Sequence, residues 1–158
     1  IGCGNGRNSI FLSGKGCLVD AIDVADTGWF SSLSPVLKKY IIFQRIDIGD
    51  FNWENKKYDV ALLLRVMQYL SSSQLEKLIK NIQVHLDDQG ILLANYVEKG
   101  GIHNRPEVDV PKFSHGIKHV KKLFNKYFTQ VDVKKGAGVS MYVKYNEPLV
   151  SYDIKCVK

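Results

Sequence analysis

Cysteine is scarce in this 158-residue sequence, and long apolar runs are missing. Its three cysteines, Cys3, Cys17 and Cys156, lack metal-ligand spacing, so we expect reduced thiols, no bound metal and a cytoplasmic location. No apolar run approaches the roughly 20 residues that cross a bilayer, so we expect no membrane segment. There is no basic and then apolar leader at the start, where a glycine-rich stretch stands instead. The hydrophobic fraction of 45% is nevertheless enough to fill a core, and the length suits a single domain over residues 1–158.

Acidic residues are scarce only in the C-terminal third. Residues 112–158 hold 10 basic and 3 acidic side chains, whereas residues 1–111 hold 12 and 13. The net charge of +6 therefore belongs to the C-terminal third, where it can attract nucleic acid or an anionic substrate. Four lysines of this region are interpreted as a solvated helix face, with an RNA-facing surface as the alternative: Lys118, Lys121, Lys122 and Lys126.

Short apolar runs alternate with helical patterns along the chain, which is typical of an α/β fold with a parallel sheet. We expect strands, buried on both faces, at residues 17–22, 41–46, 60–64 and 91–97. We expect closing strands at residues 129–135 and 149–157, with a glycine-rich turn at residues 136–138.

Helices are expected at residues 6–13, 27–33, 73–86 and 115–128. In the first, Ile10 and Phe11 should point inward, and Pro35 should end the second or start a new turn. In the third, Ser73 and Glu76 have the spacing of a capping box. In the last, His115 and His119 lie four residues apart, but a third metal ligand at useful spacing is missing.

The chain opens with alternating glycines, Ile1-Gly2-Cys3-Gly4-Asn5-Gly6. Glycine at every second position permits a tight strand-to-helix turn and lets a ligand lie against bare main chain. A dinucleotide-binding turn would need glycine where Arg7 stands, so that alternative is disfavoured. Gly14-Lys15-Gly16 lacks the spacing and the hydroxyl residue of a phosphate-binding Walker loop.

Two acids follow expected strands. Asp23 can accept both hydrogen bonds from a ribose diol, although a helix-capping role is the alternative. Asp47 can accept from an adenine amino group while the N–H of Ile48 meets a ring nitrogen. Asp50 competes with Asp47, but it is better interpreted as a turn acid.

Taken together, these residues resemble the class I S-adenosylmethionine-dependent methyltransferases along the whole chain. Residues 2–6 are similar to that family's motif I, and residues 86–93, Leu-Asp-Asp-Gln-Gly-Ile-Leu-Leu, to its turn into strand 5. Residues 58–70, from Tyr-Asp-Val at the start to Val-Met-Gln-Tyr-Leu at the end, look like motif IV and its following turn. Within the family, residues 6–9, 11–12 and 19–23 resemble the tellurite-resistance-type small-molecule methyltransferases.

The resemblance implies S-adenosylmethionine as cofactor and a Rossmann-like sheet of order 3-2-1-4-5-7-6, in which strand 7 is antiparallel. It implies cofactor contacts from Gly2, Cys3, Gly4, Asn5, Gly6, Asn8, Asp23, Val24, Asp47, Ile48, Leu64 and Arg65. Only Ile1 remains of the family's strand 1. The acid that precedes motif I and the lid helix of the family are missing from this sequence. We therefore expect a partial sequence, in which strands 2 and 4 lack their shared neighbour.

The expected activity is methyl transfer to a small-molecule nucleophile, with a soft sulfur, selenium or tellurium acceptor as one option. Such an acceptor needs no general base, so no catalytic residue is assigned. Acceptor-site candidates lie near the C-terminal edge of the sheet or in the long loop of residues 98–112: Arg65, Gln68, Tyr69, Tyr96, His103 and Arg105. A core position for Tyr69, a surface position for Arg65 and a solvated role for His103 and Arg105 are the alternatives.

Other functions stay open. The Asn/Asp-Pro-Pro-aromatic run of methyltransferases that act on exocyclic amines of nucleobases or on glutamine is missing after the strand at residues 60–64, where Arg-Val-Met-Gln stands. An RNA methyltransferase that uses the basic C-terminal third is the first alternative. A cofactor-binding domain without turnover is the second, and a nicotinamide-binding oxidoreductase the weakest. The protein is expected to be a monomer or homodimer, with nucleic acid as a less favoured partner.

Overall fold

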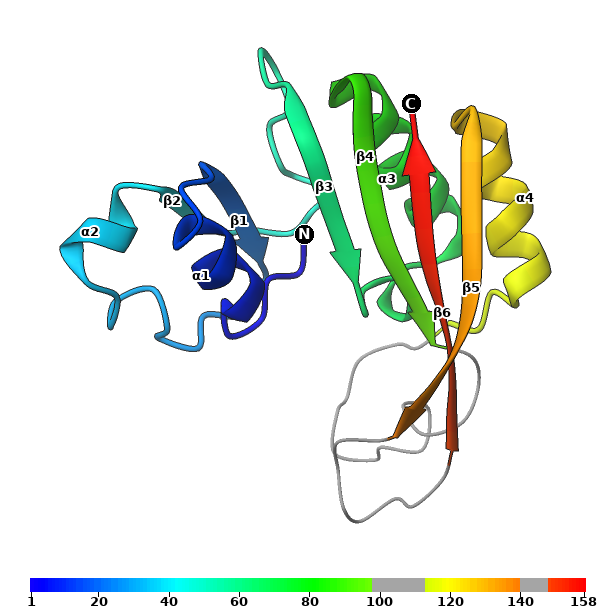
Figure 1. Ribbon diagram of the computed structural model, residues 1–158, viewed down its shortest axis with the longest axis horizontal. Coiled ribbons are helices and arrows are strands. Elements are labelled where there is room, and N and C mark those ends of the chain that lie inside the picture. The colour runs from blue at the N-terminus through cyan, green and yellow to red at the C-terminus, as the bar shows by residue number, and fades with distance from the viewer. Residues whose placement is uncertain (98–112, 140–147) are drawn as a thin grey trace. The chain divides into compact units, whose positions relative to one another are not determined.

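The computed structural model describes residues 1–97, 113–139 and 148–158, and these form two compact units (Figure 1). The first unit spans Ile1–Asn52 and the second Trp53–Lys158. Two expected acceptor-site residues, His103 and Arg105, lie outside the described residues together with the whole loop of residues 98–112. Among the described residues, no helix has both the length and the apolar character needed to span a membrane.

The first unit is a small α/β layer. Its elements are α1 (Arg7–Ser13), β1 (Val19–Asp23), α2 (Pro35–Lys38) and β2 (Ile41–Arg45). The two strands are parallel and in register from Val19 opposite Ile41 to Asp23 opposite Arg45. A parallel pair needs a long crossover connection, which residues 24–40 supply. The carboxyl ends of β1 and β2 therefore lie at the same edge of the sheet.

The core of the first unit gathers on one face of β1 and β2. Ala21, Trp29 and Ile41 are buried there, and six partly buried side chains pack against them: Cys3, Ile10, Val19, Phe30, Leu33 and Phe43. The Trp29 ring meets the Phe30 and Phe43 rings edge-on at centroid distances of 5.7 and 5.3 Å. The aromatic residues between β1 and α2 therefore serve as core.

Three predictions for this unit are wrong. Phe11 is 64% exposed, because the seven-residue helix α1 turns Ile10 but not Phe11 toward the core. Residues 27–33 contain turns and bends in place of the predicted helix. Pro35 starts α2, which Ser34 caps, so the second of its two predicted roles is confirmed. Ile42 of β2 is 60% exposed, because a parallel strand is buried on both faces only where helices cover both.

The second unit has a mixed four-stranded sheet of order β3-β4-β6-β5. Its strands are β3 (Tyr58–Leu64), β4 (Leu86–Val97), β5 (Gln130–Val139) and β6 (Pro148–Val157). β3 and β4 are parallel, whereas β6 runs antiparallel between β4 and β5. This arrangement corresponds to the expected order 4-5-7-6 with its antiparallel strand 7. The full seven-stranded order stays a prediction.

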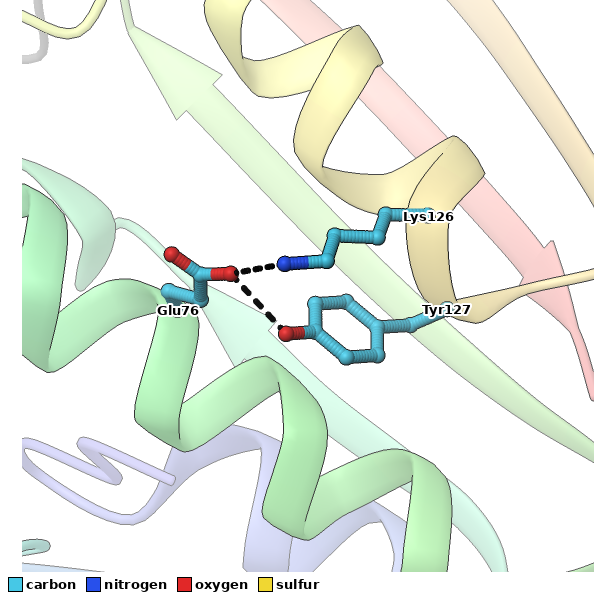
Figure 2. A network of polar contacts seen from close by, with 3 residues as sticks. All are labelled: Glu76, Lys126 and Tyr127. Atoms are coloured by element: carbon cyan, nitrogen blue, oxygen red, sulfur yellow. Dashed lines mark hydrogen bonds and ion pairs between the residues drawn. The ribbon is translucent and has the colours of Figure 1, made fainter.

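Two helices cover one face of this sheet, α3 (Ser72–His85) and α4 (Ile117–Tyr127) (Figure 1). Each presents an apolar stripe of helical period to the core, Leu75, Leu78, Ile79 and Ile82 from α3 and Val120, Leu123 and Phe124 from α4. Glu76 of α3 accepts hydrogen bonds from Lys126 and Tyr127 of α4, at 2.6 and 2.9 Å (Figure 2). These bonds link the two helices outside the core.

The start of α3 differs from the prediction. The N-cap is Ser71, which exchanges hydrogen bonds with Gln74, and Ser73 already lies within the helix. Glu76 is therefore free of a capping role and reaches α4 instead. The predicted glycine-rich turn at residues 136–138 is also wrong, because these residues continue β5 in register with β6.

The turn predicted before residue 91 is present as an irregularity within β4. The pairing of β3 with β4 shifts there, because Tyr58 lies opposite Leu86 but Val60 lies opposite Ile91. Within this stretch of β4, Gln89 has a left-handed φ of 68°. A Cβ at Gly90 would lie 2.8 Å from the Asp87 carbonyl oxygen, so only glycine fits there. On β3, Val60 is 46% exposed, so this strand too is not buried on both faces.

Candidate functional site

The glycine-rich loop leads directly into α1. Gly2, Gly4 and Gly6 have φ values of 63°, 56° and 74°, the left-handed region that other residues rarely adopt. The first hydrogen bond of α1 runs from Ile10 N–H to the Gly6 carbonyl, so the N–H groups of residues 7–9 have no helical partner. The loop therefore offers bare main chain and unbonded donors, which suits an anionic or strongly polar ligand.

Gly6 is required for a second reason. A Cβ at this position would lie 2.6 Å from Trp29 Cζ3, closer than packed atoms tolerate. The indole of Trp29 is buried, and its Nε1 has no hydrogen-bond partner among the described residues. The core of the first unit therefore presses directly against the loop.

Asp23 ties the loop to the end of β1. Its Oδ2 accepts from Gly4 N–H at 2.7 Å and its Oδ1 accepts from Ala25 N–H at 2.9 Å. Cys3 N–H donates to the Ile22 carbonyl at 3.0 Å beside it. A carboxylate has about four lone-pair sites, so Asp23 keeps acceptor capacity for a ribose diol. Among the described residues it caps a turn, not a helix.

Asp47 lies at the same edge of the sheet, just beyond β2. Its Oδ1 accepts from Gly49 N–H at 2.7 Å, which leaves Oδ2 exposed. Ile46 N–H donates to the Asp23 carbonyl at 2.9 Å and joins the two strand ends. The structure thus brings the loop, Asp23, Asp47 and Ile48 together within the first unit. Asp50 follows in the same turn, its N–H bonded to the Asp47 carbonyl.

Cys3 sits between the glycines but is a poor nucleophile. Burial, and then the negative charge of Asp23, raises the pKa of its thiol to about 11. The thiolate is therefore rare near neutral pH, and a nucleophilic role for Cys3 is disfavoured.

A second group of predicted residues follows β3 in the second unit. Leu64 ends β3, and Arg65 adopts a left-handed φ of 59°, which costs a non-glycine residue about 1–3 kcal/mol. Gln68 is 1% exposed, and its Nε2 donates to the Arg65 carbonyl at 2.6 Å, while its Oε1 has no partner in the part of the chain that the structure describes. This buried amide therefore holds the strained turn in place.

The two predicted tyrosines have different environments. Tyr69, in the short 3-10 helix η1 (Met67–Tyr69), is 41% exposed, so the alternative of a core position is wrong. Tyr96 on β4 is fully buried, and its ring stacks on Tyr152 at a centroid distance of 6.4 Å. Its hydroxyl accepts from Gly116 N–H at 2.9 Å.

The segment that precedes α4 is bound to the same turn, which the sequence did not indicate. Phe113 N–H donates to the Gln68 carbonyl at 2.7 Å. His115 Nε2 lies 3.0 Å from the Met67 carbonyl, and since a carbonyl only accepts, Nε2 carries the proton. His115 Nδ1 lies 3.4 Å from Ser72 Oγ. Hydrogen bonds thus join the segment of residues 113–116 to the turn after β3, which contains Arg65, Gln68 and Tyr69, and to Tyr96 near the end of β4.

Metal binding has no support from the histidines. The His115 and His119 rings stack at a centroid distance of 6.1 Å, and Nε2 of His115 is engaged by a carbonyl. Among the described residues, no group of three or more potential ligands could hold a metal ion.

The model of one protein family, the tellurite resistance protein TehB, matches residues 1–100 of this chain. A curated relative, the ribosomal protein L11 methyltransferase of Campylobacter concisus (strain 13826), is 35% identical over 82 residues, which cover 51% of this chain and 30% of that protein. The chain thus matches under a third of the length of this relative.

Solved structures share the fold. TehB from Haemophilus influenzae has a TM-score of 0.72 at 20% identity, covering 99% of this chain and 55% of that chain. A putative S-adenosylmethionine-dependent methyltransferase from Listeria monocytogenes has a TM-score of 0.76 at 17% identity, covering 100% and 88%. Magnesium protoporphyrin IX methyltransferase from Synechocystis PCC 6803, with bound S-adenosylhomocysteine, has a TM-score of 0.70 at 17% identity, covering 99% and 71%. These likenesses confirm the predicted Rossmann-like α/β fold class.

Proposed function

Because the chain belongs to the family of the tellurite resistance protein TehB and has the fold of class I S-adenosylmethionine-dependent methyltransferases, we propose that it transfers a methyl group from S-adenosylmethionine to a small-molecule nucleophile. The observation that carries this proposal is the hydrogen bond from Gly4 N–H to Asp23 Oδ2. It fixes a glycine-rich loop beside an acid at the end of a parallel strand, where α/β sheets bind ligands.

The first unit supplies the groups that would hold the cofactor. Asp23 has spare lone pairs for the ribose hydroxyls, and Asp47 Oδ2 is free to accept from the adenine amino group. The Ile48 N–H lies next to Asp47 in the same turn. The bound cofactor supplies an electrophilic methyl group on its sulfonium, and the protein's own part is to orient the reactants and exclude water.

A soft, anionic acceptor fits the second unit best. Two polar side chains at this turn are engaged with main chain, Gln68 with the Arg65 carbonyl and His115 with the Met67 carbonyl. Neither of these described groups is placed as a free general base, and a thiolate, selenide or telluride acceptor needs none. Arg65 brings a positive charge to this turn, which favours an anion.

The activity is tested by incubating the protein with S-adenosylmethionine carrying a radiolabelled methyl group and a panel of tellurite, selenite, thiols and mixed metabolites. Label in a small-molecule product supports the proposal. Calorimetry with S-adenosylhomocysteine and with NAD separates the alternatives. Binding of S-adenosylhomocysteine without any label transfer indicates a non-catalytic domain, and binding of NAD alone contradicts the proposal.

The assignment of the adenine contact is tested by Asp47→Asn with Asp50→Asn as the matched control. The amide that replaces the Asp47 carboxylate keeps the oxygen that accepts from Gly49 N–H but loses the acceptor offered to adenine. A hydrogen bond to a charged group contributes about 1.5–3 kcal/mol, so affinity for S-adenosylhomocysteine should fall at least tenfold in D47N. D50N should bind like wild type, and equal losses in the two variants would reject the assignment.

A further inference from the structure

Helix α4 presents a positive face to solvent. Val120, Leu123 and Phe124 form its buried stripe. Lys118, Lys121 and Lys122 are all exposed. At 100° per residue, Lys118 and Lys122 lie on the opposite side of the helix from the stripe, and Lys121 lies on its flank. The face they form, called the lysine face below, extends about 6 Å along the helix axis from Lys118 to Lys122.

Acidic side chains do not neutralise the lysine face. The first turn of α4 contains no acid, so the lysine charges repel one another and add to the positive end of the helix dipole. The nearby carboxylate of Glu76 is engaged by Lys126 and Tyr127 (Figure 2). Within the described residues, no ion pair reaches Lys118, Lys121 or Lys122. Their mutual repulsion is therefore uncompensated within this part of the protein.

Aromatic rings lie beside the lysine face. The rings of Phe113, His115 and His119 stack in a row, with centroid distances of 6.5 and 6.1 Å and interplanar angles of 23° and 20°. His119 ends this row and is exposed, one residue from Lys118. Proteins that bind single-stranded nucleic acids combine exposed flat rings, on which bases stack, with positive charges that hold the phosphates.

We propose that the lysine face of α4 binds the phosphate backbone of a single-stranded nucleic acid, with a base stacked on His119. A membrane surface fits less well, because an interfacial helix must insert its apolar side and that of α4 is buried against the sheet. The proposal does not rest on the proposed methyl transfer. It concerns the second unit alone, and its binding assay contains no cofactor.

The test is fluorescence anisotropy of a labelled single-stranded RNA titrated with the whole protein between about 50 and 200 mM salt. The variant K118Q/K121Q/K122Q should bind at least tenfold more weakly. The slope of log K against log salt should become shallower by about 2, because each lost phosphate contact removes about 0.7 on a single strand. The control K39Q/K77Q/K80Q removes the same charge from exposed lysines elsewhere, one just after α2 and two on α3, and should bind within twofold of wild type.

The ring contact is tested separately. His119→Ala should weaken RNA binding about fivefold or more at an unchanged salt slope, whereas His119→Phe keeps a ring for stacking and should restore affinity. Circular dichroism confirms that each variant is folded. A wild type that binds neither single-stranded RNA nor single-stranded DNA, equal losses in the two triple lysine variants, or H119A binding like wild type would overturn the proposal.

The same binding assay is repeated with single-stranded DNA and with vesicles of anionic lipid. Equal binding of DNA and RNA supports recognition of the phosphate backbone itself, and tighter binding of RNA supports RNA as the source. Binding of the vesicles without binding of either nucleic acid overturns the proposal in favour of a membrane surface.

Discussion

Asp23 has a structural role beside the binding role proposed for it. Its carboxylate holds Gly4 N–H and Ala25 N–H, so it fixes the shape of the glycine-rich loop before any ligand arrives. Trp29 acts on the same loop from the core side, because its ring occupies the space that a side chain at position 6 would need. Preorganisation of this kind lowers the entropic cost of binding.

Replacing Gly6 by alanine should disrupt this loop. The new Cβ would overlap the Trp29 ring, and the left-handed φ of 74° adds about 1–2 kcal/mol of strain. Gly4→Ala is the control, because it has a similar φ of 56° but no atom within 4 Å of the added Cβ. Urea unfolding should give a larger loss of stability for G6A than for G4A. Equal losses would mean that the close approach of Trp29 has no energetic weight.

At the scale of elements, α3 and α4 are joined both by their apolar stripes and by the Glu76 contacts outside the core (Figure 2). The stripes carry most of the packing energy, since exposed ion pairs contribute little. The segment before α4 is tied to η1 and β4 by main-chain and His115 hydrogen bonds. Packing thus places the helices, and polar contacts place the turn at the strand ends.

The Glu76 contacts should make stability depend on pH. Hydrogen bonds from Lys126 and then Tyr127 lower the pKa of the Glu76 carboxyl. Their stabilisation is fully present above the unfolded pKa of this carboxyl and is lost as the pH falls through the lower folded pKa. Wild type should therefore exceed Glu76→Gln in thermal stability at neutral pH, and the two should converge in acid. A difference that persists well below the unfolded pKa would contradict this role.

The His115 contact can be tested through the segment it anchors. His115→Ala removes the hydrogen bond to the Met67 carbonyl, which should cost about 1 kcal/mol. Hydrogen exchange at the amides of Phe113 and Gly116 should become faster, because both bonds lie in the same segment. His119→Ala, which removes a neighbouring ring without a hydrogen bond to the turn, should leave these amides protected. Unchanged exchange in H115A would show that the backbone bonds suffice.

At the scale of the molecule, the first unit holds most of the proposed cofactor groups, and the second holds the proposed acceptor groups together with the cofactor candidates Leu64 and Arg65. The prediction of a single domain stays a prediction, and so do the individual cofactor and acceptor contacts. The excess positive charge belongs to the second unit, and on α4 it is concentrated away from the core.

Cofactor binding should raise the stability of the whole protein through mass action. S-adenosylhomocysteine at 100 times its dissociation constant should add about 2.7 kcal/mol to the free energy of unfolding. NAD at the same concentration should add nothing. Thermal unfolding followed by circular dichroism measures both, and stabilisation by NAD alone would contradict the assignment of the glycine-rich loop.

Local sequence patterns were sufficient to predict the fold class, the family and the positions of most elements. Three kinds of pattern span only a few residues each and can therefore be recognised in the sequence: alternating glycines, strand-end acids such as Asp23, and apolar stripes at helical spacing. This is why β1, β2, β3 and α4 lie within two residues of their predicted bounds.

Features that depend on contacts between distant residues became visible only in the folded chain. The capping box is formed by Ser71 and Gln74 and not by the predicted pair. The aromatic residues after β1 belong to the core and do not form the predicted helix, because packing overrides weak local preference. The contact of Trp29 with Gly6, the link from His115 to Met67 and the burial of Tyr96 all involve separate elements of the fold. Such contacts leave no periodic signal in the sequence, because the residues that make them are brought together only by tertiary packing.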